Sequence, residues 1–158
     1  MRGAEAVESF LDRHRRVGLD TSVFIFETEK NPKYIELVRP VFRWLMGPAG
    51  LGVTSTITML EVLVQPYRAG DQKRAGDFLA LLSTYPHLQW IAPTLDVMIR
   101  AASLRAAHNL STPDAIQAAT AMLGLADGFI SNDAAFRRLN GLDVLVLDDL
   151  TPLAGSAP

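Results

Sequence analysis

The sequence predicts an α/β fold with a mostly parallel central sheet and helices on both of its faces. Short apolar runs suited to buried strands alternate with longer segments whose apolar residues recur at helical spacing. Their order along the chain is strand, two helices, strand, two helices, strand, two helices, strand, helix, strand, which favours parallel pairing with helical crossovers. The 158 residues are 49% hydrophobic and 20% charged, so they can bury the core of one domain.

The first half of the chain is predicted to hold two strands, at 16–20 and 51–54, and the helices around them. Residues 1–15 form a charged, helical N-terminal extension, with Phe10 and Leu11 available to dock on the body. Capping residues follow each strand, and each cap starts a helix. The four helices expected here run through 21–26, from Asn31-Pro32 to Gly47-Pro48, through 56–68, and up to residue 82.

The second half is predicted to hold three strands, at 88–91, 129–131 and 144–147. A helix starts at Pro93-Thr94, and the next starts at Ser111-Thr112-Pro113-Asp114, where a hydroxyl cap, a first-turn proline and an acid come together. Asn132-Asp133 caps a short last helix. The domain is expected to span 16–149, with 150–158 as a C-terminal tail.

Composition excludes several classes of function. There is no cysteine, so disulfides, thiolate metal sites and a cysteine nucleophile are excluded. Fifteen basic against 17 acidic residues give a formal charge of −2, which argues against a protein that coats nucleic acid by bulk charge. Charges interrupt the N-terminus, and no window approaches the ~20 apolar residues of a membrane span. We therefore expect a cytoplasmic protein without membrane contact.

Three aspartates are candidate site residues, and two of them lie where an open parallel sheet places its ligands, outside the carboxyl ends of its strands. Asp20 follows the first strand, Asp133 follows the strand that ends at Ser131, and Asp114 occupies the first turn of its helix. Each of the three, taken alone, is also explained as an ordinary helix cap or dipole partner, worth ~0.5–2 kcal/mol.

Glu61 is harder to explain as a structural residue. It shares a helical face with Ile57 and Val64, and an ionised carboxylate on an apolar face is costly unless it is paired, protonated or bound to a cation. A partner such as Arg68, or a face that is less buried than the pattern indicates, are the alternative explanations.

The four carboxylates carry more weight together than singly. Acids brought close together repel one another and raise one another's pKa, so the arrangement makes sense mainly if a divalent cation holds them ionised. Hard oxygen ligands select Mg²⁺, with Mn²⁺ as a substitute. Such a site polarises a phosphodiester and turns bound water into a nucleophile.

The ordered motifs are similar to those of the PIN-domain family, most closely the VapC toxins of bacterial toxin–antitoxin pairs. The resemblance runs over about residues 16–148 and lies in four segments: Val17-Gly18-Leu19-Asp20-Thr21-Ser22, Thr58-Met59-Leu60-Glu61-Val62, Thr112-Pro113-Asp114-Ala115-Ile116-Gln117-Ala118-Ala119, and Ile130-Ser131-Asn132-Asp133-Ala134-Ala135-Phe136. It implies a three-layer PIN-like fold and a metal site of Asp20, Glu61, Asp114 and Asp133, with Thr21, Ser22 and Ser131 as supporting hydroxyls. A second acid that the family often has two residues after the last Asp is here Ala135.

The leading hypothesis is a Mg²⁺-dependent endoribonuclease whose metal-activated water hydrolyses RNA, and the resemblance implies the toxin of a type II pair with an antitoxin partner. Long apolar helix faces suggest a homodimer or a partner chain. An Asp-nucleophile phosphatase is a second interpretation, but it needs an acid at Ser22. A non-catalytic PIN-fold binding module is the third, and the four acids count against it.

Overall fold

The computed structural model describes residues 2–151, which form seven α-helices, five strands and two 3₁₀ helices. The strands are β1 (Arg16–Leu19), β2 (Leu51–Ser55), β3 (Leu88–Ile91), β4 (Gly128–Ser131) and β5 (Asp143–Val146). The helices are α1 (Arg2–Arg13), α2 (Thr21–Thr28), α3 (Ile35–Met46), α4 (Ile57–Arg68), α5 (Gln72–Leu82), α6 (Leu95–His108), α7 (Thr112–Leu123), η1 (Ala134–Arg138) and η2 (Leu147–Leu150). None of the helices in this part of the chain is long and apolar enough to cross a bilayer.

The five strands form one sheet in the order β3-β2-β1-β4-β5, and every neighbouring pair is parallel. The predicted α/β class and the predicted order of elements are thereby confirmed. β1 lies at the centre, with Gly18 opposite Val53 of β2 on one side and Phe129 of β4 on the other. The carboxyl ends of β2, β1 and β4 therefore meet at one edge of the sheet.

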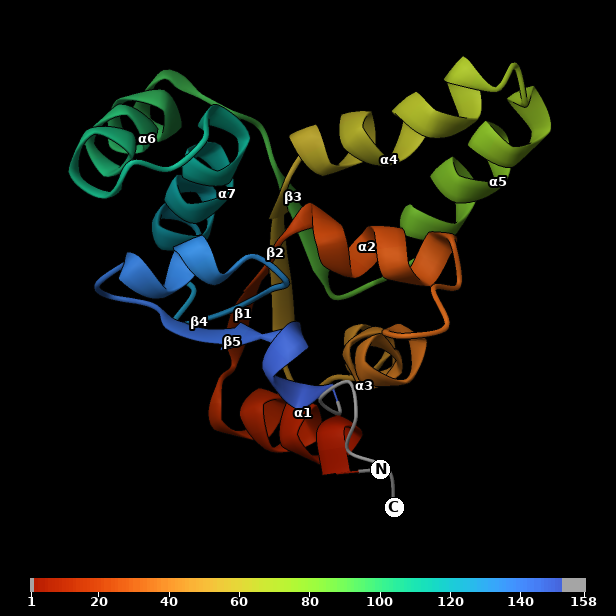
Figure 1. The fold of residues 1–158 in the computed structure, drawn as a ribbon, viewed down its shortest axis with the longest axis horizontal. Helices are drawn as coiled ribbons and strands as arrows, with labels where there is room; N and C mark the ends of the chain where they lie inside the picture. The colour runs from red at the N-terminus through yellow and green to blue at the C-terminus, as the bar shows by residue number, and fades with distance from the viewer. Residues whose placement is uncertain (1, 152–158) are drawn as a thin grey trace.

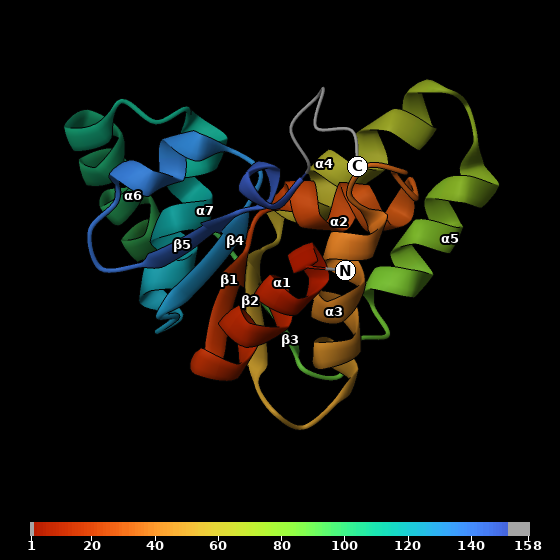
Figure 2. The ribbon, with the colours of Figure 1, turned by 60° about the horizontal axis from the view of Figure 1, so that its bottom comes forward.

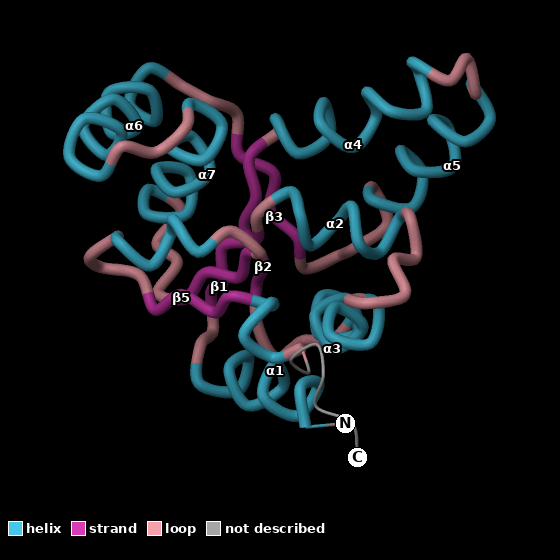
Figure 3. The backbone as a smooth tube through the Cα atoms, viewed as in Figure 1, coloured by secondary structure: helices cyan, strands magenta, loops and turns pink. Residues whose placement is uncertain are grey.

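Helices cover both faces of the sheet and make three layers. Figure 1 shows α6 and α7 on one side of the strands and α2 and α3 on the other, and the turned view in Figure 2 places α1 on the same side as α3. The strands gather in the middle of the molecule (Figure 3). The helices α4 and α5 pack against each other and reach outward beside α2.

Alternating side chains of the central strand divide the core in two. Val17 and Leu19 are fully buried among the helices α1 to α5, whereas Gly18 lies against α7. A Cβ atom at Gly18 would stand 2.6 Å from the side chains of both Ala121 and Phe129, so only glycine allows α7 to approach β1 this closely. This contact fixes α7, and with it Asp114, against the sheet.

Two helix boundaries differ from the sequence-based prediction. The helix expected from Asn31-Pro32 begins at Ile35, because the Asn31 side chain accepts a hydrogen bond from the backbone N–H of Lys33 and forms a turn first. The last expected helix is a 3₁₀ helix, η1. The helix α1 buries Phe10 and Leu11 in the larger core cluster. Residues 152–158 of the expected tail lie outside the described residues.

Candidate active site

The two strand-end aspartates lie at the same edge of the sheet. Leu19 and Ile130 are opposite each other in the β1–β4 pair, so Asp20 and Ser131 leave neighbouring strands side by side. The Ser131 hydroxyl donates to Oδ2 of Asp20 over 2.7 Å and accepts the backbone N–H of Asp133 over 2.9 Å. One buried serine thus joins the segments that carry Asp20 and Asp133.

Asp20 is buried at the N-cap position of α2. Its side chain makes no capping hydrogen bond there, although the adjacent backbone N–H of Thr21 helps to lower its pKa, so helix capping does not explain this residue. Ser22 adds a second hydroxyl bond to Oδ2 over 3.2 Å. Burial raises the pKa of Asp20 above its ordinary value, the charge of Glu61 adds to this effect, and the serine hydroxyls oppose it.

The carboxyl group of Asp133 lies close enough to Asp114 to affect its pKa. Burial, the neighbouring Asp133 carboxyl and the charge of Asp20 together raise the pKa of Asp114 to about 7. Asp133 also accepts the backbone N–H of Ala135 over 2.9 Å, so the capping explanation holds for this residue alongside its place at the site.

Glu61 lies on a face of α4 that is not part of the core. Leu60 beside it is 63% exposed, Glu61 itself is half-buried, and the buried face of α4 carries Val62 instead. The face that Glu61 shares with Ile57 and Val64 is half-buried, which is the alternative of a less buried face, because α2 and α5 pack against a different stripe of α4. Glu61 forms no ion pair with Arg68, the proposed alternative, among the ion pairs of residues 2–151. The Thr21 hydroxyl instead donates to Oε1 of Glu61 over 2.9 Å.

The family model of the PIN domain matches residues 17–142, a segment that contains all four acids. The chain belongs to the PIN domain family. No curated protein sequence matches it significantly.

Solved structures show the same fold. The VapBC2 structure from Rickettsia felis, bound to a promoter DNA fragment, matches with a TM-score of 0.66 at 15% identity, over 83% of this chain and 98% of that one. VapC20 of Mycobacterium tuberculosis, a sarcin–ricin loop cleaving toxin, matches at 0.64 and 17% identity over 82% and 98% of the two chains. VapBC-1 from nontypeable Haemophilus influenzae matches at 0.64 and 17% identity over 84% and 98%.

The chemistry of the donors in this PIN domain fits a hard divalent cation. All four candidates are carboxylates, and burial together with the charge of neighbouring acids raises the pKa of Asp20 and Asp114. Between residues 2 and 151, no three Asp, Glu or His side chains are grouped so that they could already hold a metal ion. In this PIN domain, hydroxyl groups donate hydrogen bonds to two of the acids, Asp20 and Glu61.

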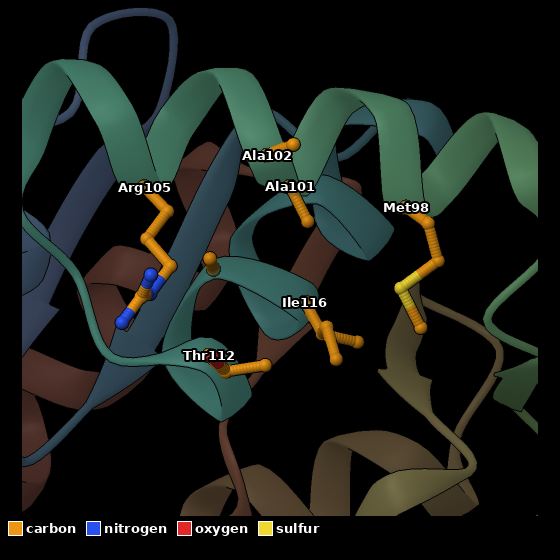
Figure 4. Close-up of a pocket in the computed structure, with 7 residues that line it drawn as sticks. Met98, Ala101, Ala102, Arg105, Thr112 and Ile116 are labelled. Atoms are coloured by element: carbon orange, nitrogen blue, oxygen red, sulfur yellow. The ribbon is translucent and has the colours of Figure 1, made fainter.

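A cavity of about 210 Å³ between α6 and α7 lies outside this acidic site (Figure 4). Its lining is apolar apart from Thr112 and Arg105, and it includes none of the four acids. The side chains of Met98 and Ile116 face it from the two helices (Figure 4). It has no carboxylate in its lining that could bind a hard metal ion.

The sequence interpretation missed one buried polar group beside the acids. Gln117 is 2% exposed and donates to the hydroxyls of Thr21 and Thr58. The available signal was a single amide inside the otherwise apolar run from Ala115 to Ala121, on the helix that Asp114 opens.

Proposed function

We propose that the protein is a Mg²⁺-dependent endoribonuclease, with Mn²⁺ as a substitute cation, and the toxin of a type II toxin–antitoxin pair. The observation that carries the proposal is that the buried Ser131 joins the segments of Asp20 and Asp133 at the strand ends, with the carboxyl groups of Glu61 and Asp114 close enough to interact with them. Carboxylates held this close together repel one another and destabilise the fold, and a bound cation offsets this repulsion. PIN-family membership and the fold shared with VapC structures support the same activity.

In this mechanism, Asp20, Glu61, Asp114 and Asp133 would hold the cation. A bound divalent ion would lower the pKa of water and stabilise charge on a phosphodiester. Ser131 and Ser22 orient the Asp20 carboxylate, and Thr21 orients Glu61. Asp114, whose pKa is raised to about 7, would have to lose its proton before it could act as a ligand.

We propose RNA as substrate and an antitoxin protein as partner, in the cytoplasm, because the similar structures include VapBC complexes and an RNA-loop cleaving toxin. Exposed apolar side chains on α4, α5 and α6 give surfaces for a partner or for a homodimer: Leu60, Tyr67, Leu79, Leu95, Met98 and Ile99. Light scattering of the isolated chain decides whether it is a dimer.

One observation favours a second function, a PIN-fold module that binds without catalysis: the acids between residues 2 and 151 form no ready three-ligand group. Calorimetric titration with Mn²⁺ separates the two. A catalytic PIN domain binds the ion, whereas the binding module leaves the heat signal flat.

The deciding experiment compares Mg²⁺-dependent cleavage of single-stranded RNA by wild type and Glu61→Gln, with EDTA controls against metal-free nucleases. We expect the fold to survive, because the amide keeps the shape of a half-buried side chain and sheds its charge. Cleavage falls by about two orders of magnitude or more. Glu5→Gln, exposed on α1, is the matched control and keeps the wild-type rate. Equal rates for Glu61→Gln and wild type would remove Glu61 from the site.

A further inference from the structure

Gln117 connects three segments that carry site residues. Its Nε2 donates to Oγ1 of Thr21 over 3.1 Å and to Oγ1 of Thr58 over 2.8 Å, and its Oε1 accepts the backbone N–H of Ser55 over 3.3 Å. Thr21 follows Asp20, Thr58 lies one helical turn before Glu61, and Gln117 lies one turn after Asp114. Every hydrogen-bonding group of this buried amide therefore faces the scaffold of the acidic site.

The hydrogen-bond partners fix which way each proton points. A backbone N–H can only donate, so the Ser55 contact identifies the acceptor oxygen of Gln117 and leaves both of its N–H groups for the two threonines. Thr54 donates to the Leu19 carbonyl over 2.8 Å. In the 2.7 Å contact between Thr54 and Thr58, the proton must then come from Thr58.

The same accounting makes the Thr21 hydroxyl a donor, because Gln117 occupies one of its lone pairs and Thr58 donates its own proton to Thr54. The Thr21 proton has two acceptors within reach, Oγ1 of Thr58 at 3.2 Å and Oε1 of Glu61 at 2.9 Å. It goes to Glu61, because a carboxylate oxygen is the stronger acceptor and also the nearer one. This bond holds Glu61 near Asp20 against the repulsion between the two carboxylates.

We propose that Gln117 is a positioning residue that, through Thr21, holds Glu61 in place to bind the cation. The inference rests on the proposed function, because it gives the cation-binding acids a supporting amide. Groups that orient metal ligands typically change metal affinity about 10- to 100-fold when they are removed. Glu61 needs such support because its half-exposed helix face gives no packing to fix the side chain.

Mn²⁺ titration calorimetry of a double-mutant cycle tests the proposal. Gln117→Met keeps the length of the side chain and removes both donors, so we expect Mn²⁺ to bind about tenfold more weakly. Thr21→Val removes the hydroxyl that Gln117 orients and weakens binding by a similar factor. If Gln117 acts through Thr21, the double variant binds no more weakly than Thr21→Val alone. Additive losses, or an unchanged affinity in Gln117→Met, would overturn the proposal.

Three further variants exclude a merely structural effect. Thr120→Val removes another fully buried hydroxyl from α7, one that bonds only to the Ile116 carbonyl of its own helix, and leaves Mn²⁺ affinity unchanged. Thr21→Ser retains the hydroxyl and retains most of the affinity. Gln117→Glu is isosteric and serves if Gln117→Met does not fold, because a carboxylate in this place accepts the Thr21 proton and again weakens Mn²⁺ binding.

The outcomes separate the two proposals. A wild-type protein that binds no Mn²⁺ would refute the proposed function itself. A wild-type protein that binds Mn²⁺ with Gln117 variants of equal affinity would refute only the role of Gln117.

Discussion

Lowering the pH from 8 to 6 should weaken metal binding through Asp114. Burial, the neighbouring Asp133 carboxyl and the charge of Asp20 raise the pKa of this carboxyl to about 7 from its ordinary 3.8. Metal ligands must be ionised, so a cation has to displace the proton of Asp114. The pH of the solution therefore sets how much of the protein is ready to bind.

The size of the effect follows from the pKa. A group with a pKa of about 7 is about nine-tenths protonated at pH 6 and about one-tenth at pH 8, so the apparent Kd for Mn²⁺ should be about tenfold weaker at pH 6. The same raised pKa also makes the stability of the metal-free fold depend on pH. The folded chain keeps a proton that the unfolded chain releases between pH ~4 and ~7, so stability falls as pH rises through this range.

Titration calorimetry at pH 6, 7 and 8, in pairs of buffers with different ionisation heats, measures both the affinity and the number of protons released. Asp114→Asn removes the titrating group, so its weaker binding should vary little with pH. A wild-type Kd that does not change between pH 6 and 8 would refute the reasoning. If the Kd of Asp114→Asn for Mn²⁺ changes with pH as steeply as that of the wild type, the titrating proton belongs to another acid.

Three further outcomes are expected. Mg²⁺ should raise the melting temperature of the wild type, because the cation relieves repulsion among the acids, and Asp20→Asn should reduce this gain. A wild-type melting temperature that does not change with Mg²⁺ would contradict the proposed site. Gly18→Ala should cost about 1–3 kcal/mol in urea unfolding, because its Cβ atom would overlap the side chains of Ala121 and Phe129. Phe10→Ala should cost about 3–5 kcal/mol, because the ring is only 2% exposed; a loss below about 1 kcal/mol would make α1 a dispensable extension.

The strands and their order were predictable because the signals are local. Val17 and Leu19 alternate with Gly18 and are followed directly by Asp20. The buried run Phe129-Ile130-Ser131 is followed two residues later by Asp133, so strand ends and acids could be read from short runs. Parallel pairing then brought Asp20 and Asp133 to one edge without further information. The meeting of these acids follows from topology alone.

The environment of Glu61 and the role of Gln117 were not predictable in this way. Which stripe of α4 is buried depends on how α2 and α5 pack on it, and helical spacing does not contain that information. The partners of Gln117 lie 59, 62 and 96 residues away along the chain, on three different segments. A lone glutamine in an apolar run shows only that something must satisfy its amide.

The central place of β1 also bears on when the proposed site assembles during synthesis. Ser131, whose hydroxyl holds the Asp20 carboxylate, follows Asp20 by 111 residues, and the strand between β1 and the edge strand β5 is β4. Pairings so distant in sequence form late, and chains are made from the N-terminus onward. A growing chain that stops before Gly128 therefore carries three of the four acids without β4, the strand whose serine holds Asp20 in place.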